Sequence, residues 1–538
     1  MKFTKIAIPE LTAALHQRGF SYVGRGWNGW MMLTGELRLK ARSYPCEIAV
    51  SSELDEFPRV WLTPVPPGRP ELQPHLSASG YLCYLALGSV IFDFFDPIRQ
   101  TMACLDRAEQ VLEDILAGKM IDDLAEEFHV TWGSTSCMLD VNESRPGILE
   151  AYTFGQKVTV VTDDKVRSRA KLDAMGFGLP KIDLSAFRVS TKARPMPLQA
   201  SWPPKTVQAF LRWQNTLDSR CSKKVEQRLL EMFRAKATRV LVLIDSPVVQ
   251  YGIEVELKRQ LASVGKKSSM REDLYRLPIR RISVYRIDDK YLAGRNLPGS
   301  KTLAGLKVAL IGCGTIGGYL AEMLAKAGAG TVGGRLTLVD MGSFEPGNLG
   351  RHRLGFNALL MSKAEAMREE LRRVSPGIDV VAIADDAKAA PLGTLDLLID
   401  VTGEQALTDW LTWKYADKAP FLSAWVEGAG AAVRALMKAE PEHACARCVS
   451  QPPLKDQYRV FDVAPAVIMR GHGCEGLYVP FPASTSVQAA ALAMEMVQAW
   501  LDGAETPSFR TRVLDQSRQV HFKDCTPARY QGCPACAT

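Results

Sequence analysis

The strongest constraint on the fold of this 538-residue chain is a glycine-rich turn between an apolar strand and a small-residue helix. Residues 308–311 form a short apolar run, which predicts a buried parallel strand. Gly312, Gly314 and Gly317 follow in G-x-G-x-x-G spacing. Such glycines let the backbone approach a phosphate, while the helix offers its free N–H groups. A second apolar strand ends at Asp340, an acid suited to a ribose hydroxyl. This pattern fits both a nicotinamide dehydrogenase and a nucleotide-using ligase.

The residues that follow Asp340 favour the ligase. Asn348 and Arg351 lie in the run NLGRH, and Lys363 comes eleven residues after its histidine. Adenylation develops negative charge on the α-phosphate and releases pyrophosphate, so the site needs cations aimed at those oxygens. The order resembles the Rossmann-like, ThiF-type adenylation fold of ubiquitin-activating enzymes and of their bacterial relatives that activate sulfur-carrier proteins. The resemblance implies that Asp340 holds the ribose of ATP and that Asn348, Arg351 and Lys363 hold its phosphates.

The same resemblance implies further contacts to ATP and Mg²⁺. The family often has an arginine upstream of the glycine loop, sometimes acting across a dimer interface, and Arg295 is the candidate. A third buried strand ends at Asp400, close to where relatives place a Mg²⁺-linked aspartate. Position 403 is glycine here, so either Asp400 or Glu404 supplies the carboxylate, or phosphates and water hold the ion. We also expect a homodimer through this domain.

Two C-x-x-C pairs lie near the C-terminal end, Cys445 with Cys448 and Cys533 with Cys536. Four thiolates can bind one tetrahedral zinc ion, although ordinary thiols or a redox pair are alternatives. The activating family uses two such distant knuckles. We therefore predict a structural zinc site with all four positions closed.

A glycine-rich segment between these pairs contains Cys474 and, two residues earlier, His472. A long small-residue helix follows this segment. In the sulfur-carrier-activating relatives, the cysteine that attacks the adenylate precedes such a helix on a mobile loop, and Cys474 occupies that place. Flanking glycines suit a nucleophile that must move, and His472 could lower its pKa. The resemblance implies a thioester on Cys474.

Residues 1–142 predict a separate α+β domain with a helix, antiparallel strands, a proline-rich loop and further helices. An H-x₄-G-x-x-C loop runs from His75 to Cys83. The order is similar to ubiquitin-conjugating enzymes, which implies that Cys83 is a thioester cysteine and His75 an active-site residue. Leucine and serine replace the proline and asparagine that follow the family's histidine. The oxyanion role of that asparagine then passes to Ser77, Ser79 or backbone N–H groups.

The rest of the chain shows no further catalytic motif, but it bounds the domains and excludes some classes of partner. Residues 143–290 predict a mixed α/β connecting domain, with a helix over 255–264, and residues 291–538 the adenylation domain. A net charge of +7, spread along the chain, gives no argument for nucleic acid. With no run of eighteen apolar residues and no signal-peptide core, we expect a cytoplasmic protein that does not bind membranes.

The whole chain is similar to bacterial fusions of a conjugating module to an activating module, which occur in antiphage operons of the CBASS kind. The resemblance implies that Mg-ATP activates the C-terminal carboxylate of a partner, either a cyclic-oligonucleotide synthase or a ubiquitin-like protein. The acyl group would pass to Cys474, then to Cys83, and finally to an amine of a target. One alternative is a sulfur-carrier adenylyltransferase whose N-terminal half only docks a partner. The phosphate-side cations and cysteine pairs disfavour the other, a nicotinamide oxidoreductase.

Overall fold

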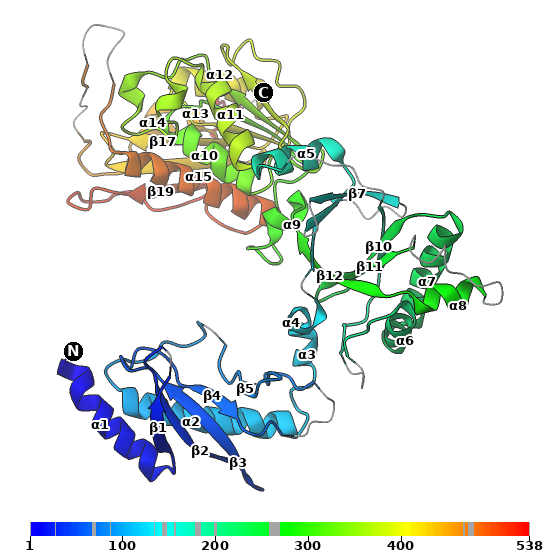
Figure 1. Cartoon of the computed structure of the whole chain (residues 1–538). Coiled ribbons are helices and arrows are strands. Elements are labelled where there is room, and N and C mark those ends of the chain that lie inside the picture. Colours follow the sequence, from blue (N-terminus) through cyan, green and yellow to red (C-terminus); the bar gives the residue numbers. More distant parts are fainter. Residues whose placement is uncertain are drawn as a thin grey trace. The chain divides into compact units, whose positions relative to one another are not determined.

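The chain divides into two compact units, and Figure 1 traces the elements of the computed structural model along the sequence. The first unit comprises Met1–Cys137, Pro146–Leu149 and Ile182–Tyr285, and the second Met138–Arg145, Glu150–Lys181 and Arg286–Thr538. The structure describes residues 2–26, 28–66, 72–86, 88–133, 135–142, 148–154, 158–177, 184–197, 202–257, 269–465, 469–471 and 478–536.

An antiparallel sheet lies in the first unit, with its five strands in sequence order. They are β1 (Ser21–Arg25), β2 (Met31–Arg38), β3 (Ser43–Val50), β4 (Arg59–Leu62) and β5 (Tyr81–Leu82). Along β2, Met31, Leu33 and Leu37 are buried and their neighbours more exposed, as expected for a strand with one face on a core. Apolar stripes of α1 (Lys2–Gln17) and α2 (Pro97–Leu116) complete this core.

A closed barrel of seven strands contains the central part of the sequence. Its order is β10 (Arg239–Asp245), β11 (Gln250–Glu256), β12 (Ile279–Arg286), β6 (Thr135–Asp140), β8 (Val158–Thr162), β7 (Ile148–Phe154) and β9 (Ser185–Ser190). Beside strands β9 to β11 pack α6 (Val207–Leu217), α7 (Ser219–Arg234) and α8 (Met270–Arg276). The remaining helices here are α3 (Asp123–Glu126), α4 (Phe128–Trp132), α5 (Lys165–Ala174) and α9 (Asp289–Gly294). The helix predicted over 255–264 is wrong at its start, because Val255 and Glu256 end β11 in antiparallel pairing with β10.

The second unit contains a seven-stranded sheet. Its order is β15 (Val380–Ile383), β14 (Arg335–Val339), β13 (Lys307–Ile311), β16 (Leu397–Asp400), β17 (Phe421–Glu427), β18 (Ala432–Lys438) and β19 (Phe509–Val513). Pairing is parallel from β15 to β17 and antiparallel from β17 to β19.

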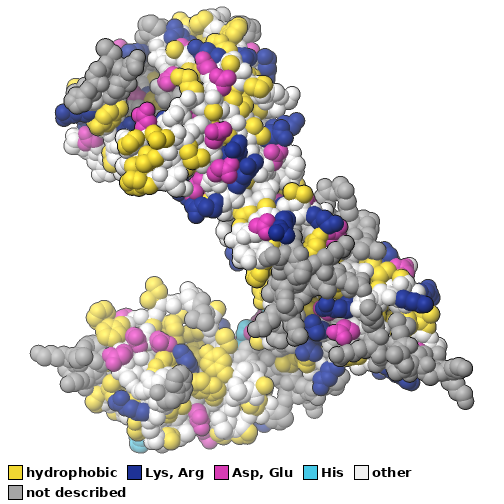
Figure 2. Space-filling view, turned by 45° about the horizontal axis from the view of Figure 1, so that its top comes forward, with side chains coloured by type: hydrophobic (Ala, Val, Ile, Leu, Met, Phe, Trp, Pro, Cys, Tyr) yellow, Lys and Arg dark blue, Asp and Glu magenta, His cyan; other side chains and the backbone are white. Residues whose placement is uncertain are grey.

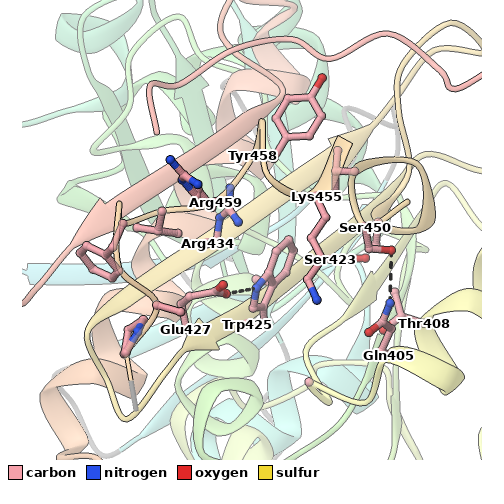
Figure 3. A pocket seen from close by; sticks show the side chains of 18 of the residues that line it. Gln405, Thr408, Ser423, Trp425, Glu427, Arg434, Ser450, Lys455, Tyr458 and Arg459 are labelled. Carbon is pink, nitrogen blue, oxygen red and sulfur yellow. Dashed lines mark hydrogen bonds between the residues drawn. The ribbon is translucent and has the colours of Figure 1, made fainter. Parts of the chain in front are cut away.

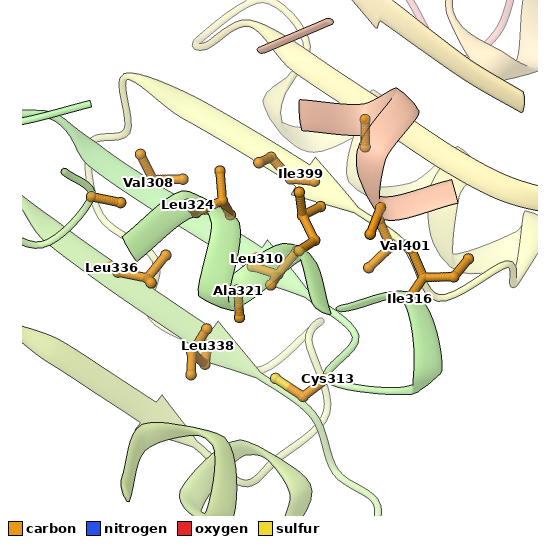
Figure 4. Packing of buried hydrophobic residues seen from close by; sticks show 14 of the residues in the cluster. Val308, Leu310, Cys313, Ile316, Ala321, Leu324, Leu336, Leu338, Ile399 and Val401 are labelled. Carbon is orange, nitrogen blue, oxygen red and sulfur yellow. The ribbon is translucent and has the colours of Figure 1, made fainter. Parts of the chain in front are cut away.

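Helices cover both faces of this sheet, because alternate residues of its buried strands point to opposite sides. Val308 and Leu310 of β13 join a core with α10 (Thr315–Lys326), α11 (Lys363–Val374) and α15 (Ala483–Asp502). Figure 4 shows part of this packing, with Ala321 and Leu324 of α10 over the strands. The intervening Ala309 and Ile311 pack instead with α12 (Gln405–Tyr415).

The parallel strands β13, β14 and β16 all end at the same edge of the sheet, as in other open α/β sheets, where ligands bind at that edge. The glycine loop, Asp340 and the segment after Asp400 therefore meet there. Within the described residues, no helix combines the length and the apolar character needed to cross a bilayer. On the face of the molecule in Figure 2, acidic and basic side chains are interspersed.

Candidate active sites

A cavity of about 770 Å³ opens at the carboxyl edge of the second unit's sheet. Gly312, Gly314 and Thr315 line it, so the first turn of α10 presents its N-terminal end to the cavity. Gly317 lies in this turn, packed against the loop, where a Cβ would stand 1.8 Å from the carbonyl oxygen of Gly312. Only glycine allows this close approach of helix and loop, so the N-terminal end of α10 faces the cavity, where its N–H groups could bind an anion.

Hydrogen bonds to Asp340 and His352 hold the glycine loop in place. Asp340 accepts bonds from the N–H groups of Cys313 and Gly342, each at 2.7 Å, and lines the cavity. Nδ1 of the buried His352 accepts a 3.0 Å bond from the Leu354 N–H, so its Nε2 carries the proton and donates to the carbonyl of Cys313 at 2.8 Å. Burial lowers the pKa of His352, which keeps this neutral form. His352 thus braces the loop and does not act as a cation.

Three predicted phosphate ligands line the same cavity. The structure brings together Asn348, Arg351 and Lys363. The side-chain oxygen of Asn348 accepts a 3.0 Å bond from the Glu345 N–H, which caps the start of the short 3₁₀ turn η1 (Pro346–Asn348). Its amide nitrogen is therefore the group left to donate. Lys363 is the first residue of α11. A Cβ at position 342 would stand 3.1 Å from its Nζ.

Arg351 has no carboxylate within ion-pair distance among the described residues. Its Nη1 donates to the carbonyl of Val479 at 2.8 Å, and its guanidinium lies over the rings of Phe481 and Tyr478, at 4.4 and 5.5 Å. Burial lowers its pKa, yet arginine stays protonated at neutral pH. This aromatic support was not predicted from the sequence, because it comes from a segment far along the chain.

The two carboxylates predicted to hold Mg²⁺ line different cavities in the structure. Glu404 lines the cavity, together with the exposed Asp385 and Asp386 that follow β15. Asp400 is 2% exposed and lines a different cavity. Its carboxylate accepts bonds from the Thr402 N–H and from the hydroxyls of Thr402 and Thr408, while burial raises its pKa. Of the two carboxylates predicted to hold Mg²⁺, Glu404 therefore lines the cavity and Asp400 does not.

Arg295 does not line the nucleotide cavity. It is exposed at the end of α9, where its guanidinium donates to the Tyr291 hydroxyl at 3.2 Å and to the Asn296 side chain at 3.1 Å. The predicted contact between Arg295 and ATP would therefore join Arg295 of one copy of the chain to ATP bound in a second copy.

Cys83 follows β5 in the first unit and is partly exposed. Its backbone N–H donates to the carbonyl of His75 at 2.8 Å. Burial, with the charge of Glu127 as a second cause, raises the pKa of its thiol. Gly80 allows the tight turn before it, since a Cβ there would stand 2.4 Å from the carbonyl oxygen of Leu62. Ser77 and Ser79, the predicted oxyanion donors, are exposed, with their hydroxyls 2.9 Å apart.

His75 is held between two acids that sequence analysis missed. Its Nδ1 lies 2.7 Å from Glu127 and its Nε2 3.0 Å from Asp123, and its own N–H donates to Glu127. The hydrogen bond to Glu127, opposed by burial and aided by Asp123, raises the pKa of His75 to about 9. An imidazolium with both nitrogens engaged cannot accept a proton. We predicted His75 as a catalytic residue, but its geometry argues for a positioning role beside Cys83.

The segment that contains Cys474 and His472 lies outside the described residues. The base of that segment is described: Arg470 and Tyr478 pair through two backbone bonds of 2.9 Å. One residue further, Val479 accepts the bond from Arg351. The segment of the predicted nucleophile is thus joined at its base to the predicted phosphate arginine.

The four cysteines of the C-x-x-C pairs meet in one buried cluster. Their sulfur atoms are separated by 3.6 Å (Cys445–Cys448), 3.8 Å (Cys445–Cys533) and 3.5 Å (Cys448–Cys536). A tetrahedral zinc ion with Zn–S bonds of 2.3 Å requires sulfurs about 3.8 Å apart, whereas a disulfide requires about 2 Å. The donor set and its spacing therefore fit zinc. In addition, the Tyr530 N–H lies 3.4 Å from the sulfur of Cys448.

Comparison with known proteins shows two matching family models. One, described as the ThiF family, matches residues 291–535, and the other, described as Prokaryotic E2 family B, matches residues 37–137. The ATP-dependent ubiquitin transferase-like protein Cap2 of Pseudomonas aeruginosa is 46% identical over 537 residues, which are 98% of this chain and 99% of that protein. The chain belongs to the family of ATP-dependent ubiquitin transferase-like Cap2 proteins.

Two further relatives agree with this assignment. The Cap2 protein of Vibrio cholerae is 27% identical and matches over 86% of each chain. The molybdopterin-synthase adenylyltransferase of Escherichia coli is 27% identical over 256 residues, 46% of this chain and 92% of that protein. The chain is therefore an ATP-dependent ubiquitin transferase-like enzyme, with an N-terminal ubiquitin-conjugating-like domain and a C-terminal ThiF-type adenylation domain. The fold class and the resemblance inferred from the sequence are confirmed.

Proposed function

We propose that this enzyme uses Mg-ATP to activate the C-terminal carboxylate of a partner protein and conjugates it to an amine through two thioesters. The observation that carries the proposal is the pair of cationic side chains that lines the nucleotide cavity beside a helix N-terminus. Arg351 and Lys363 line it beside the N-terminus of α10, and Arg351 has no acid within ion-pair distance in the described structure. Such a cavity suits a triphosphate whose charge shifts during reaction.

In the first step, a carboxylate oxygen attacks the α-phosphorus of ATP, and the bond from this phosphorus to the bridging oxygen of pyrophosphate breaks. Asp340 has further lone pairs for a ribose hydroxyl, while Asn348, Arg351 and Lys363 donate to phosphate oxygens. Glu404, with Asp385 and Asp386 nearby, would hold Mg²⁺, which neutralises phosphate charge when bound.

In the second step, the thiolate of Cys474 attacks the acyl carbon and AMP leaves, giving a thioester. The Cys83 thiolate then displaces Cys474, and an amine displaces Cys83 to give an amide. The raised pKa of Cys83 leaves little thiolate at neutral pH, so its proton must be removed during transfer. The bond from Arg351 to Val479 supports a link between phosphate binding and the Cys474 segment.

The remaining parts of the proposal follow from the family resemblance. The partner is a cyclic-oligonucleotide synthase or a ubiquitin-like protein, and the setting is cytoplasmic antiphage defence of the CBASS kind. A homodimer through the adenylation domain would let Arg295 of one copy reach ATP in the other. A structural zinc ion on the four clustered cysteines supports the fold of this domain.

Single-cysteine variants test the order of the two thioesters. With ATP and the partner protein, Cys474→Ala should still exchange pyrophosphate but form no thioester. Cys83→Ala should load Cys474 and fail to form an amide. Cys525→Ala, a partly exposed cysteine outside the cluster, serves as the control and should behave as wild type. Thiol treatment before gel electrophoresis removes thioester bands and leaves amide bands. Undiminished conjugation by Cys83→Ala would refute the relay and favour an adenylyltransferase whose N-terminal domain only docks a partner.

A further inference from the structure

A second cavity of about 540 Å³ lies in the adenylation unit. Its wall includes residues of β16, β17, β18 and α12, the helix α13 (Ala446–Val449) beside the cysteine cluster, and residues 455–465. Gly403 and Trp425 line both this cavity and the nucleotide cavity, so the two adjoin. Figure 3 shows its labelled side chains, including Arg434 and Lys455.

Arg434 is an unusual component of this wall because it is 5% exposed and charged. Its Nε donates to the Thr511 hydroxyl at 3.1 Å. Its Nη2 is shielded from solvent and has no hydrogen-bond partner among the described residues. The guanidinium lies over the rings of Phe509 and Phe522, at 4.1 and 4.6 Å. Burial lowers its pKa to about 10, so it remains a cation at neutral pH.

The acids that line this cavity do not form an ion pair with Arg434. Glu427 accepts a 2.9 Å bond from the indole nitrogen of Trp425, as Figure 3 shows. Asp462 pairs with Arg459 at 3.8 Å, and Asp400 is occupied by two hydroxyls and a backbone N–H. The fourth, Asp456, is exposed. A buried cation is stabilised far better by an ion-paired, hydrogen-bonded acid than by aromatic rings alone.

This cavity also adjoins the point that the substrate's C-terminus has to reach. The carboxylate that attacks ATP has to reach the nucleotide cavity, and the residues before it extend away from that point. The adjoining cavity, entered past Gly403 and Trp425, has room for such a tail. Arg434 lines its wall with an unpaired guanidinium nitrogen, and a guanidinium is the group that binds carboxylates best.

We infer that this cavity selects a protein substrate with an aspartate or glutamate shortly before its C-terminal residue, whose side-chain carboxylate pairs with Arg434. The inference rests on the proposed function, because it assumes that a protein C-terminus enters the nucleotide cavity. Lys455, which also lines this cavity and is exposed, adds positive charge to it. Arg434 then acts as a specificity residue for the tail, outside the reacting atoms.

Peptide substrates test the inference directly. Heptapeptides with a free C-terminal glycine carry one glutamate at each of the five preceding positions in turn, against isosteric glutamine controls. ATP–pyrophosphate exchange by the full-length enzyme, at millimolar peptide, measures activation. We expect wild type to favour glutamate over glutamine at one or two positions by about 10- to 100-fold in kcat/KM, the size of a charge-assisted hydrogen bond.

Variants assign the preference to Arg434. Arg434→Gln should abolish the glutamate preference while still activating glutamine peptides, and Arg434→Lys should keep part of it. Arg512→Gln, on the neighbouring strand β19 with its guanidinium bonded to Glu495, is the matched control and should keep all of it. ATP binding by each variant verifies that its adenylation domain is folded.

The outcomes separate the two claims. Equal use of glutamate and glutamine peptides by wild type would overturn the inference alone, even if Arg434→Gln does not fold. A preference that survives in Arg434→Gln would do the same. Failure of every peptide, acidic or neutral, to stimulate exchange by wild type would refute the proposed activation of a C-terminal carboxylate.

Discussion

Replacing Glu127 with Gln should lower the pKa of His75 and loosen the loop that carries Cys83. Glu127 is the stronger of the two acids on this histidine, with its carboxylate 2.7 Å from Nδ1 and a second bond from the His75 N–H. The backbone carbonyl of His75 accepts a bond from the Cys83 N–H. The clamp, meaning the imidazole of His75 held between Glu127 and Asp123, therefore reaches the predicted thioester cysteine through one residue. Without Glu127, only Asp123 favours the imidazolium.

The size of the effect follows from the raised pKa. A rise from 6.5 to about 9 corresponds to about 3 kcal/mol between the two protonation states, and screening at this partly exposed site reduces it to about 1–2 kcal/mol. Because the folded-state pKa lies above the unfolded value, this stabilisation is complete below pH 6.5 and disappears as the pH rises through about 9. The Cys83 loop should therefore open more readily in alkaline solution.

NMR titration of histidine Cε1–H resonances in the full-length protein measures this directly. The chain has seven histidines, and the resonance missing from His75→Gln identifies His75. We expect its midpoint near 9 in wild type, and closer to 6.5 in Glu127→Gln. Glu126→Gln is the matched control, because Glu126 pairs with Arg194 and not with His75. A wild-type midpoint at or below 7 would refute the clamp, as would an equal shift in the control.

Two further predictions concern the adenylation domain. Metal analysis should find about one zinc per chain, and a purified protein that contains no zinc would exclude this site. Cys533→Ser should lower the melting temperature more than it changes ATP–pyrophosphate exchange by the folded fraction. Arg351→Ala should reduce partner-dependent exchange by about 100- to 1,000-fold. Arg353→Gln, whose arginine pairs with Glu322 and Glu370, should not; comparable exchange in both variants would remove Arg351 from the phosphate site.

Local sequence patterns predicted the adenylation core well. The strand–glycine–helix order from Val308 is set by residues close in the chain, so periodicity and spacing were sufficient. Alternation explains why Asp400, one of the predicted nucleotide ligands, does not line the cavity. Asp400 pairs in register with Ile311, whose side chain packs towards α12, and Asp400 accordingly bonds to Thr408 of that helix. A period of two along β16 would have indicated this from the sequence.

Contacts between distant segments could not be predicted. Asp123 and Glu127 lie 48 and 52 residues from His75, and Val479 lies 128 residues from Arg351. The closed barrel depends on pairing such as that of β9 with β10, which flank two helices, and no local pattern encodes it. Asp385 and Asp386 could have been predicted, because they come two and three residues after a parallel strand that ends at the ligand-binding edge of the sheet.

The meeting of the two cysteine pairs affects how the protein would respond to cleavage. Cys445 and Cys533 are 88 residues apart in sequence, yet their sulfurs are 3.8 Å apart. The segment of Cys474 and all of α15 therefore belong to a loop whose ends meet at the cluster. With zinc bound, a protease cut beside Cys474 would leave two fragments that are held together by the ion and by the packing of α15 and β19 on β18. They would therefore migrate as one species on a native gel. The enzyme would then survive a break next to Cys474 without coming apart.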